Sequence, residues 1–329
     1  MFNYKNVYIE EWFSIVGPKA KETNLKKYNL SINDYYFNES TFEKAEIKMQ
    51  KVILNYFNRN SKPSVLVASD LMNQMTSSAI GAKNVSIPYL GLYNACASSV
   101  SGLITIANML SFKNIKDGLF ITSSHNLTAG KQFRFPTEYG APVPKRSTIT
   151  ATGAIGIKLT KKETKYKIVS STLGMVTDSY TKDAYNMGAV MAPSAVRTLI
   201  DHLKNQNKSP EDYDLVLTGD LGEVGKKIFL ELLKKENIKL KNYEDAGANF
   251  YQKNEESGAS GPAVLPLYFF NNTIYNKKYK RILLLATGSL HSPLLVNQKE
   301  SIPAVTHAIE IEVSKWLWYI HFFSAVYYV

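Results

Sequence analysis

The 329-residue chain contains one cysteine, Cys96, and this scarcity excludes two kinds of architecture. A single thiol cannot close an intrachain disulfide, and it cannot supply the several thiolates of a Cys-based zinc centre. Hydrophobic residues make up 45% of the chain and charged residues 20%, which is typical of a globular protein with a buried core. We therefore expect apolar packing, without disulfides or a metal site, to hold the fold together.

Long hydrophobic runs are also lacking. The N-terminus has no charged segment followed by an apolar one, so we expect no signal peptide. Residues 315–329 read KWLWYIHFFSAVYYV, but 15 residues fall short of the roughly 20 that a spanning helix needs. We treat 314–329 as an atypical aromatic tail: either it contacts a membrane interface, or it is an abnormal end of the reading frame.

A concentrated basic stripe is missing as well, although the formal net charge is +11. The excess is mostly lysine in separate short runs, with no nucleic-acid-binding motif, so we expect no nucleic-acid partner. A diffuse basic surface suits an anionic membrane face or an anionic ligand, and it also arises from a lysine-rich coding bias. The charge alone does not decide between these readings.

What the sequence does contain is an internal repeat. The segments 62–83 and 212–234 each read as an apolar strand ending in Asp-Leu, followed by a helix-like stretch. The segments 117–126 and 280–292 each read as a buried strand that runs into small residues and then a histidine. Continuous apolar strands alternating with helices indicate a sheet covered on both faces. We predict an α/β protein of two βαβ-type halves, 1–165 and 166–313.

Cys96 lies at a predicted strand-to-helix bend. PYLGLY (88–93) reads as a strand within a buried sheet, and apolar residues from Val100 to Leu110 follow helical spacing. Ser98 or Ser99 is a candidate cap for that helix. A helix N-terminus lowers the pKa of a thiol, so Cys96 is either a nucleophile, part of a pocket, or an inert buried side chain.

Several runs together are specific: VGPK (16–19), SDLMNQ (69–74), IPYLGLYNACASS, TSSHNLTAGKQFRFPTEYGAP, YNMGAVMAP (185–193), DYDLVLTGDLGEVG, ATGSLHSP and ESIPAVTHAIEIE. Through them, the chain from about residue 15 to 313 resembles the stage V sporulation protein AD family, thiolase-fold relatives of the β-ketoacyl synthases. The resemblance implies a thiolase-like fold, with duplicated βαβαβ halves in five α-β-α-β-α layers.

The catalytic pattern of the synthases is only partly present. The cysteine at this bend is their acylated nucleophile, supported by histidine and asparagine side chains from the second half. Here the strand-end segment that carries His-Gln-Ala-Asn in the synthases reads Thr218-Gly219-Asp220-Leu221, and the later Gly-Asn-Thr-type loop reads ESGASGP (256–262). We therefore expect no condensation chemistry and no cofactor.

The resemblance implies binding of dipicolinic acid, a flat pyridine dicarboxylate dianion, or of its calcium chelate. Such a ligand needs a slot for its ring and donors for two carboxylates, which arginine and helix N-termini supply. The candidate ligand-binding residues are Cys96, Ser98, Ser99, His125, Lys131, Phe133, Arg134, Tyr139 and His291. For His125 and His291 a structural hydrogen-bonding role is the competing interpretation. For Arg134 it is an ion pair with Glu138.

Other conspicuous residues have structural interpretations. Asp70 and Asp220 occupy equivalent places in the two halves and are expected to cap helices or bridge the halves. Gly188 and Pro193 are expected to shape a loop.

Our leading hypothesis is a non-catalytic sporulation protein that binds dipicolinic acid for its movement into or out of the spore core. The implied partners are other SpoVA proteins of the spore inner membrane, with the chain peripheral to that membrane in the forespore or spore, and a second copy of itself in a homodimer. The alternatives are an acyltransferase or β-ketoacyl synthase III-like enzyme that uses Cys96, and a structural scaffold of the SpoVA complex.

Overall fold

One mixed sheet organises the protein. The structure is a computed structural model that describes residues 1–112, 114–134, 143–253 and 256–314. Within these residues, the sheet runs in the order β5 (Tyr89–Gly91), β4 (Leu66–Ser69), β6 (Asp117–Ser124), β8 (Gly153–Thr160), β2 (Tyr8–Val16), β9 (Tyr166–Leu173), β15 (Pro303–Val313), β14 (Arg281–Ser289), β11 (Leu215–Thr218) and β12 (Tyr243–Asp245). Short strands β1 (Phe2–Asn3), β3 (Leu30–Ser31) and β10 (Thr177–Asp178) pair with β9, β2 and β15, respectively. A separate pair joins β7 (Ile149–Thr150) to β13 (Ala259–Ser260).

The two halves of the sheet repeat one pairing scheme. In the first half, β4 is parallel to β5 and β6, while β8 is antiparallel to both β6 and β2. In the second half, β11 is parallel to β12 and β14, while β15 is antiparallel to both β14 and β9. The duplication predicted from the Asp-Leu and histidine segments is thus confirmed. The halves meet at β2 and β9, where Tyr8 pairs with Lys167 and Ile9 with Tyr166. A domain boundary at residue 165 stays a prediction.

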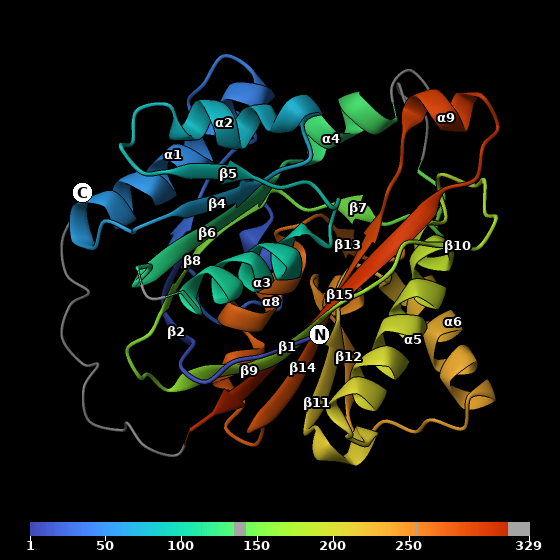
Figure 1. Cartoon of the computed structure of the whole chain (residues 1–329). Coiled ribbons are helices and arrows are strands. Elements are labelled where there is room, and N and C mark those ends of the chain that lie inside the picture. The colour runs from blue at the N-terminus through green and yellow to red at the C-terminus, as the bar shows by residue number, and fades with distance from the viewer. Residues whose placement is uncertain (113, 135–142, 254–255, 315–329) are drawn as a thin grey trace.

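Helices fill three layers around this sheet (Figure 1). The central layer holds α3 (Ser98–Leu110) and α8 (Val264–Asn271), and the two outer layers hold α1 (Phe42–Asn60) with α2 (Thr76–Ala82) and α5 (Met187–Gln206) with α6 (Gly222–Lys235). The shorter helices are α4 (Asn126–Phe133), α7 (Ala246–Asn249), α9 (Pro293–Asn297) and the 3₁₀ turns η1 (Ala20–Glu22), η2 (Asn73–Met75), η3 (Pro210–Asp212) and η4 (Thr273–Tyr275).

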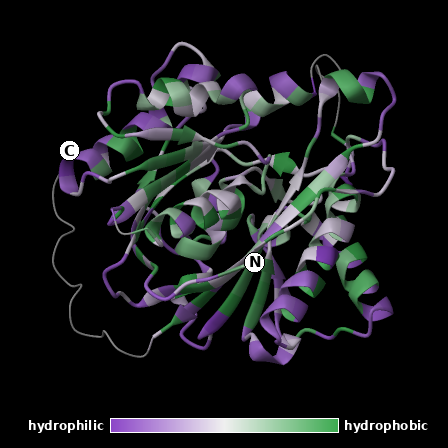
Figure 2. Ribbon diagram, viewed as in Figure 1, coloured by the Kyte–Doolittle hydropathy of each residue, from purple (hydrophilic) through white to green (hydrophobic). Residues whose placement is uncertain are grey.

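The apolar core is divided in the same way. One buried cluster joins α3 and α8 to strands of both halves, a second packs α5 and α6 on the second half, and a third packs α1 on the first half. Figure 2 shows hydrophobic strands between helices whose outward faces are polar. This layering is the predicted α-β-α-β-α arrangement. It follows from the sequence because strands that are apolar on both faces require a helix layer on each side.

Two local expectations were wrong. Gly188 and Pro193 lie inside α5 and not in a loop. The role of Gly188 is to let α6 approach α5 closely, because a Cβ at this position would lie 2.7 Å from the backbone nitrogen of Gly225. The strand before Cys96 is also not in the middle of the sheet. It is β5, an edge strand with Tyr89 and Leu90 about 40% exposed.

Among the described residues, no helix combines the length and the apolar character that crossing a bilayer requires.

Candidate functional site

The chain enters α3 through a tight turn that presents Cys96. Ala95 takes a left-handed conformation with φ of 49°, and Asn94 bridges to Cys96. The Ser98 hydroxyl accepts the Asn94 N–H at 2.8 Å and thereby closes the turn. A non-glycine residue at positive φ is uncommon and marks a backbone held by its surroundings.

The predicted capping role of Ser98 or Ser99 was wrong. Both residues lie in the first turn of α3, and the N-cap is Ala97, which makes no side-chain capping bond. The turn already places Ala97 in the right-handed helical region, so no serine occupies the extended backbone position that a capping side chain needs. Both serines are fully buried and bond within this segment, since Ser99 donates to the Cys96 carbonyl oxygen at 3.4 Å.

Asp220, from the second half, faces Cys96. It follows β11 with φ of 65°, is 1% exposed, and accepts the Gly261 N–H on Oδ2 at 3.0 Å. Its carboxyl group lies against the Cys96 thiol, and Oδ1 has no N–H or O–H partner among the described residues. The side chain that contacts the sulfur from the second half is thus a carboxyl group.

The electrostatics of this pair oppose a reactive thiolate. Although Cys96 as a residue is partly exposed, burial of its sulfur and the neighbouring Asp220 raise the thiol pKa well above its ordinary value. Burial likewise raises the pKa of Asp220 well above its ordinary value. The expectation that the helix N-terminus lowers the thiol pKa was therefore wrong, because desolvation and a like-charged neighbour outweigh the backbone N–H groups.

His125 has structural partners on both ring nitrogens. Nδ1 accepts the Leu127 N–H at 3.3 Å and so caps α4, while Nε2 lies 2.9 Å from the Tyr35 carbonyl oxygen. The ring stacks on Phe42 with centroids 5.7 Å apart, and burial lowers its pKa. Lys131, one turn further along α4, pairs with Glu43 at 2.6 Å. These contacts favour the structural interpretation of His125 and give Lys131 a carboxylate partner.

Three other predicted residues come together in a cavity of about 310 Å³, which we call the Arg134 pocket. Phe133 and Arg134 enter it from the end of α4, and His291 enters from the segment between β14 and α9. The Phe133 and His291 rings lie 5.6 Å apart, and the Arg134 Nη2 donates to the Thr148 carbonyl oxygen at 2.9 Å. The remaining lining residues are Lys182, Asp183, Ala184, Tyr185, Pro293, Val296 and Asn297.

Charge in the Arg134 pocket is net positive. Arg134 and Lys182 are cationic, and Asp183 is paired with Arg146 at 2.8 Å. Burial, with Arg134 nearby, lowers the pKa of His291 to about 4, so its imidazole is neutral at physiological pH. Tyr139, the remaining predicted residue, lies outside the described residues.

Of the two equivalent aspartates, one has the predicted helix-supporting role and the other the predicted bridging role. Asp70 accepts the N–H groups of Met72 and Ser78 at 2.8 and 2.7 Å and supports the first turn of α2, while Asp220 bridges the halves through its contact with Cys96. In the second half, the helix-supporting role belongs to Asp245, which accepts the N–H groups of Leu221 and Gly222. Asp245 had no signal in the repeat because it ends β12, a strand whose sequence does not echo its counterpart.

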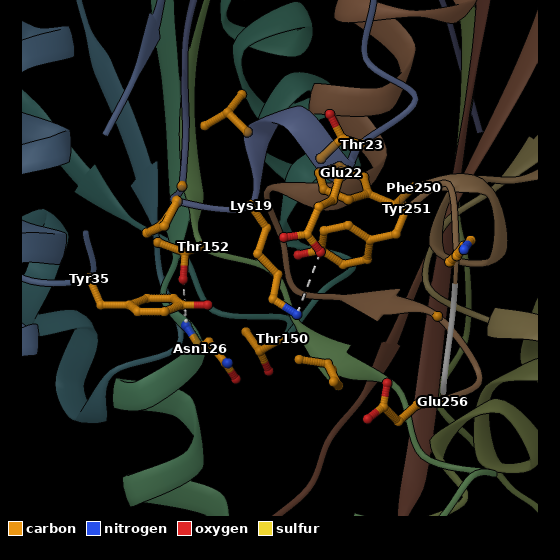
Figure 3. A pocket seen from close by; sticks show the side chains of 16 residues that line it. Lys19, Glu22, Thr23, Tyr35, Asn126, Thr150, Thr152, Phe250, Tyr251 and Glu256 are labelled. Atoms are coloured by element: carbon orange, nitrogen blue, oxygen red, sulfur yellow. Dashed lines mark hydrogen bonds and ion pairs between the residues drawn. The ribbon is translucent and has the colours of Figure 1, made fainter. Parts of the chain in front are cut away.

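A second cavity, of about 260 Å³, contains none of the predicted site residues (Figure 3). We call it the Lys19 pocket. Lys19, Tyr35, Asn126 and Thr150 of the first half face Tyr251 and Glu256 of the second. The quoted runs that contain Lys19, Asn126 and Glu256 lie far apart in the sequence, so nothing in the sequence indicated that they line one pocket.

The duplicated halves, the central pair of helices and the cysteine at the entry to α3 define a thiolase-like fold. Solved structures of this class align over almost their whole length. They include 3-oxoacyl-[acyl-carrier-protein] synthase III from Aquifex aeolicus VF5, with TM-score 0.57 and 14% identity over 93% of this chain and 99% of that one. Cerulenin-bound OleA from Xanthomonas campestris aligns with TM-score 0.60 and 15% identity over 94% and 98% of the two chains. At such identities the likeness concerns the fold alone.

The family is more specific than the fold. The family model of stage V sporulation protein AD matches residues 1–312. The stage V sporulation protein AD of Bacillus subtilis (strain 168) is 31% identical over 318 residues, which cover 93% of this chain and 94% of that protein. The chain belongs to the stage V sporulation protein AD family, which places it among sporulation proteins.

Proposed function

We propose that the protein binds dipicolinic acid, or its calcium chelate, without changing it chemically. The observation that carries the non-catalytic part is the carboxyl group of Asp220 against the Cys96 thiol. Acyl transfer requires a thiolate at neutral pH and a base to generate it. Here the thiol pKa is raised, and the partner is an acid buried beside it.

The two predicted histidines do not supply a base for the Cys96 thiol. His125 is engaged with Tyr35 and Leu127, and His291 lies against Phe133 in the Arg134 pocket. Neither has Cys96 as a partner within the described part of the chain. Neither of these two histidines thus serves as a proton acceptor for the thiol.

The Arg134 pocket has the chemistry that a flat dianion requires. Arg134 and Lys182 supply positive charge, and an arginine binds a carboxylate through two parallel N–H donors. Phe133, Tyr185 and the neutral His291 supply ring surfaces for the pyridine. Because both halves of the chain contribute walls, a ligand here is enclosed by the fold and not held on one loop.

Calorimetric titration with dipicolinate tests the proposal. We expect binding by the natural chain and at least tenfold weaker binding after Arg134→Gln, since a hydrogen bond between charged groups is worth about 1.5–3 kcal/mol. Arg59→Gln is the matched control, because Arg59 is exposed at the end of α1, outside the pocket. Absence of dipicolinate binding by the natural chain rejects the proposal.

A Cys96→Ala variant tests where the ligand lies. If the ligand occupies the Arg134 pocket, this variant binds dipicolinate like the natural chain, because Cys96 is not among the pocket residues. A loss of binding in Cys96→Ala together with an unaffected Arg134→Gln variant would move the ligand to the bend before α3.

Acyl transfer through Cys96 remains the second candidate, favoured by the strained turn that presents the sulfur at the start of α3. Intact-mass analysis after incubation with acyl-CoA detects a covalent adduct on the single cysteine. Our proposal predicts no adduct. A purely structural scaffold, the third possibility, would bind neither compound and would still assemble with its partners after changes in the pocket.

We place the protein at the periphery of the spore inner membrane, acting with other SpoVA proteins and as a homodimer. Membership of the sporulation family and the net charge of +11, which suits an anionic membrane face, support this placement. Copurification with the membrane fraction of spores, reversed by high salt, is the expected behaviour of such a peripheral protein.

A further inference from the structure

The Lys19 pocket lies between the halves of the chain and is held open by backbone contacts across the junction. Asn24 donates its N–H to the Phe250 carbonyl oxygen at 2.9 Å, and Gln252 donates to the Glu22 carbonyl oxygen at 2.8 Å. Ile149 and Thr150 of β7 line the pocket, and β7 is held by its pairing with β13, in which Thr150 lies opposite Ser260. The walls therefore come from elements that the fold fixes independently of any ligand.

Several hydrogen-bonding groups face this cavity without a hydrogen-bond partner among the described residues. Thr150 is 5% exposed, and its hydroxyl makes no hydrogen bond among the described residues. The Tyr35 hydroxyl and the Asn126 side-chain amide are likewise unpaired within that part of the chain, and Figure 3 shows both pointing into the space below Lys19. Of these residues Thr150 is buried, while Tyr35 and Asn126 are half-buried, so all three groups keep hydrogen-bonding capacity that a polar ligand in the cavity could use.

Charges of both signs line the Lys19 pocket in equal number, whereas the lining of the Arg134 pocket is net positive. Lys19 and Lys253 are balanced by Glu22 and Glu256. The Lys19 ammonium reaches into the cavity, with a loose contact of 3.9 Å to Glu22, and lies 5.9 Å from the centre of the Tyr251 ring. In Figure 3, Glu256 lies on the opposite side of the cavity from Tyr35 and Asn126. A dianion would meet Glu22 and Glu256 here, whereas a ligand with one charge of each sign satisfies both sides.

We propose that the Lys19 pocket binds a small zwitterion of the α-amino-acid type. Its carboxylate accepts hydrogen bonds from Lys19, Thr150 and Asn126. Its ammonium group pairs with Glu256, and its side chain packs on the ring of Tyr251. The cavity volume of about 260 Å³ limits the ligand to a small molecule. This site is distinct from the proposed dipicolinate site, with which it shares no lining residue.

Calorimetry of the full chain against each of the twenty common L-amino acids tests the proposal. At least one is expected to bind. The analogue of that amino acid that lacks the amino group, and the amine that lacks the carboxylate, are each expected to bind at least tenfold more weakly. Failure of every amino acid, or equal binding of the deaminated analogue, overturns the proposal, because the second result describes a simple anion site.

Variants locate the ligand. Thr150→Val keeps the shape of the side chain and removes its hydroxyl, and Glu256→Gln removes one charge. Each is expected to weaken amino-acid binding about tenfold or more. Lys19→Met is expected to do the same, while Lys21→Met is the matched control, because Lys21 lies in the same turn but does not line the pocket. Unchanged affinity in both Thr150→Val and Glu256→Gln overturns the proposal.

Dipicolinate separates this inference from the proposed function. The Glu256→Gln variant is expected to bind dipicolinate like the natural chain, and saturating dipicolinate is expected to leave amino-acid affinity unchanged. A chain that binds an amino acid but not dipicolinate supports this site and rejects the proposed function. A chain that binds dipicolinate but no amino acid rejects this site and supports the proposed function. Unfolding temperatures of all variants show whether a loss of binding reflects a loss of folding.

Discussion

At the scale of single residues, Asp70 and Asp220 follow equivalent strands, yet the surrounding structure satisfies them very differently. Asp70 accepts three hydrogen bonds, from the Met72 N–H and from the N–H and hydroxyl of Ser78. Asp220 accepts one N–H, from Gly261, and its Oδ1 is buried without an N–H or O–H donor among the described residues. The hydrogen bonds of Asp70 should therefore contribute more to the stability of the fold than those of Asp220.

We predict that Asp70→Ala lowers the free energy of unfolding by about 2–4 kcal/mol, since it removes the acceptor of two backbone N–H groups, those of Met72 and Ser78, and of the Ser78 hydroxyl. Asp220→Ala leaves a single N–H unpaired and also removes a poorly satisfied buried acid, so its cost should be about 1 kcal/mol or less. Denaturant-induced unfolding of the two variants measures the difference. An equal or larger cost for Asp220→Ala would mean that the Asp220 carboxyl group is structural.

The Cys96–Asp220 pair makes a second prediction, about reactivity. Because alkylation requires the thiolate, the raised pKa of Cys96 should make its reaction with iodoacetamide at pH 7.5 at least tenfold slower in the folded chain than in the unfolded one. Asp220→Asn should accelerate the reaction of the folded chain in part, because burial, the larger cause, remains. Mass spectrometry follows the reaction at this site alone, since the chain has one cysteine.

Rapid alkylation of the folded natural chain at neutral pH would contradict this account. It would make acyl transfer the leading candidate function.

At the scale of elements, the junction of α1, β6 and α4 depends on a buried acid. Glu46 of α1 accepts hydrogen bonds from Ser123 of β6 at 2.8 Å and from Thr128 of α4 at 2.7 Å. Burial, with Asp70 nearby, raises the pKa of Glu46 to about 7. The folded chain therefore keeps a proton on Glu46 over a pH range in which the unfolded chain has lost it.

This raised pKa sets the direction of a pH effect. The stabilisation from protonated Glu46 is fully present below about pH 4.5, the ordinary pKa, and is lost as the pH rises through about 7. We predict that Glu46→Gln, which stays neutral, is as stable as the natural chain near pH 4.5 and more stable by up to about 3 kcal/mol at pH 8. Unfolding of both proteins across this range gives the difference; a difference that does not change with pH would contradict the prediction.

Helices and strands could be predicted from the sequence where the interactions that determine them are between residues close together in the chain. The helix from Ser98 to Leu110 and the repeated strands were predictable because apolar spacing reflects burial directly. The edge position of β5 was not, because strand neighbours are set by the topology of the whole sheet. Gly188 was misread because its role is to let α6 approach α5, a contact between segments far apart in sequence.

The same distinction holds for the candidate site. Phe133, Arg134 and His291 were identified from a specific run and a repeated strand end, and the fold brings all three to one pocket. The thiol pKa was misjudged because the helix N-terminus is visible in the sequence, whereas the closeness of Asp220 exists only in three dimensions. The Lys19 pocket was missed for that reason too, since it is assembled from both halves.

At the scale of the whole molecule, β5 leaves one side of the sheet open. It pairs only with β4 among the described residues, and its Tyr89 and Leu90 are 39% and 40% exposed, with Tyr93 beyond them at 42%. An exposed apolar edge strand is a template for pairing with another chain. Two copies that meet edge to edge around a two-fold axis would pair their β5 strands and bury these side chains.

We therefore predict that the protein is a homodimer joined through β5, and that Leu90→Lys weakens self-association at least tenfold. A lysine on the edge opposes pairing because its charge would be buried in the joined sheet. Phe112→Lys is the matched control, since Phe112 is 69% exposed but lies at the end of α3 and not on an edge strand. Sedimentation velocity over a concentration series measures both. A natural chain that stays monomeric, or a Leu90→Lys variant that associates as tightly as Phe112→Lys, would show that β5 is not the interface.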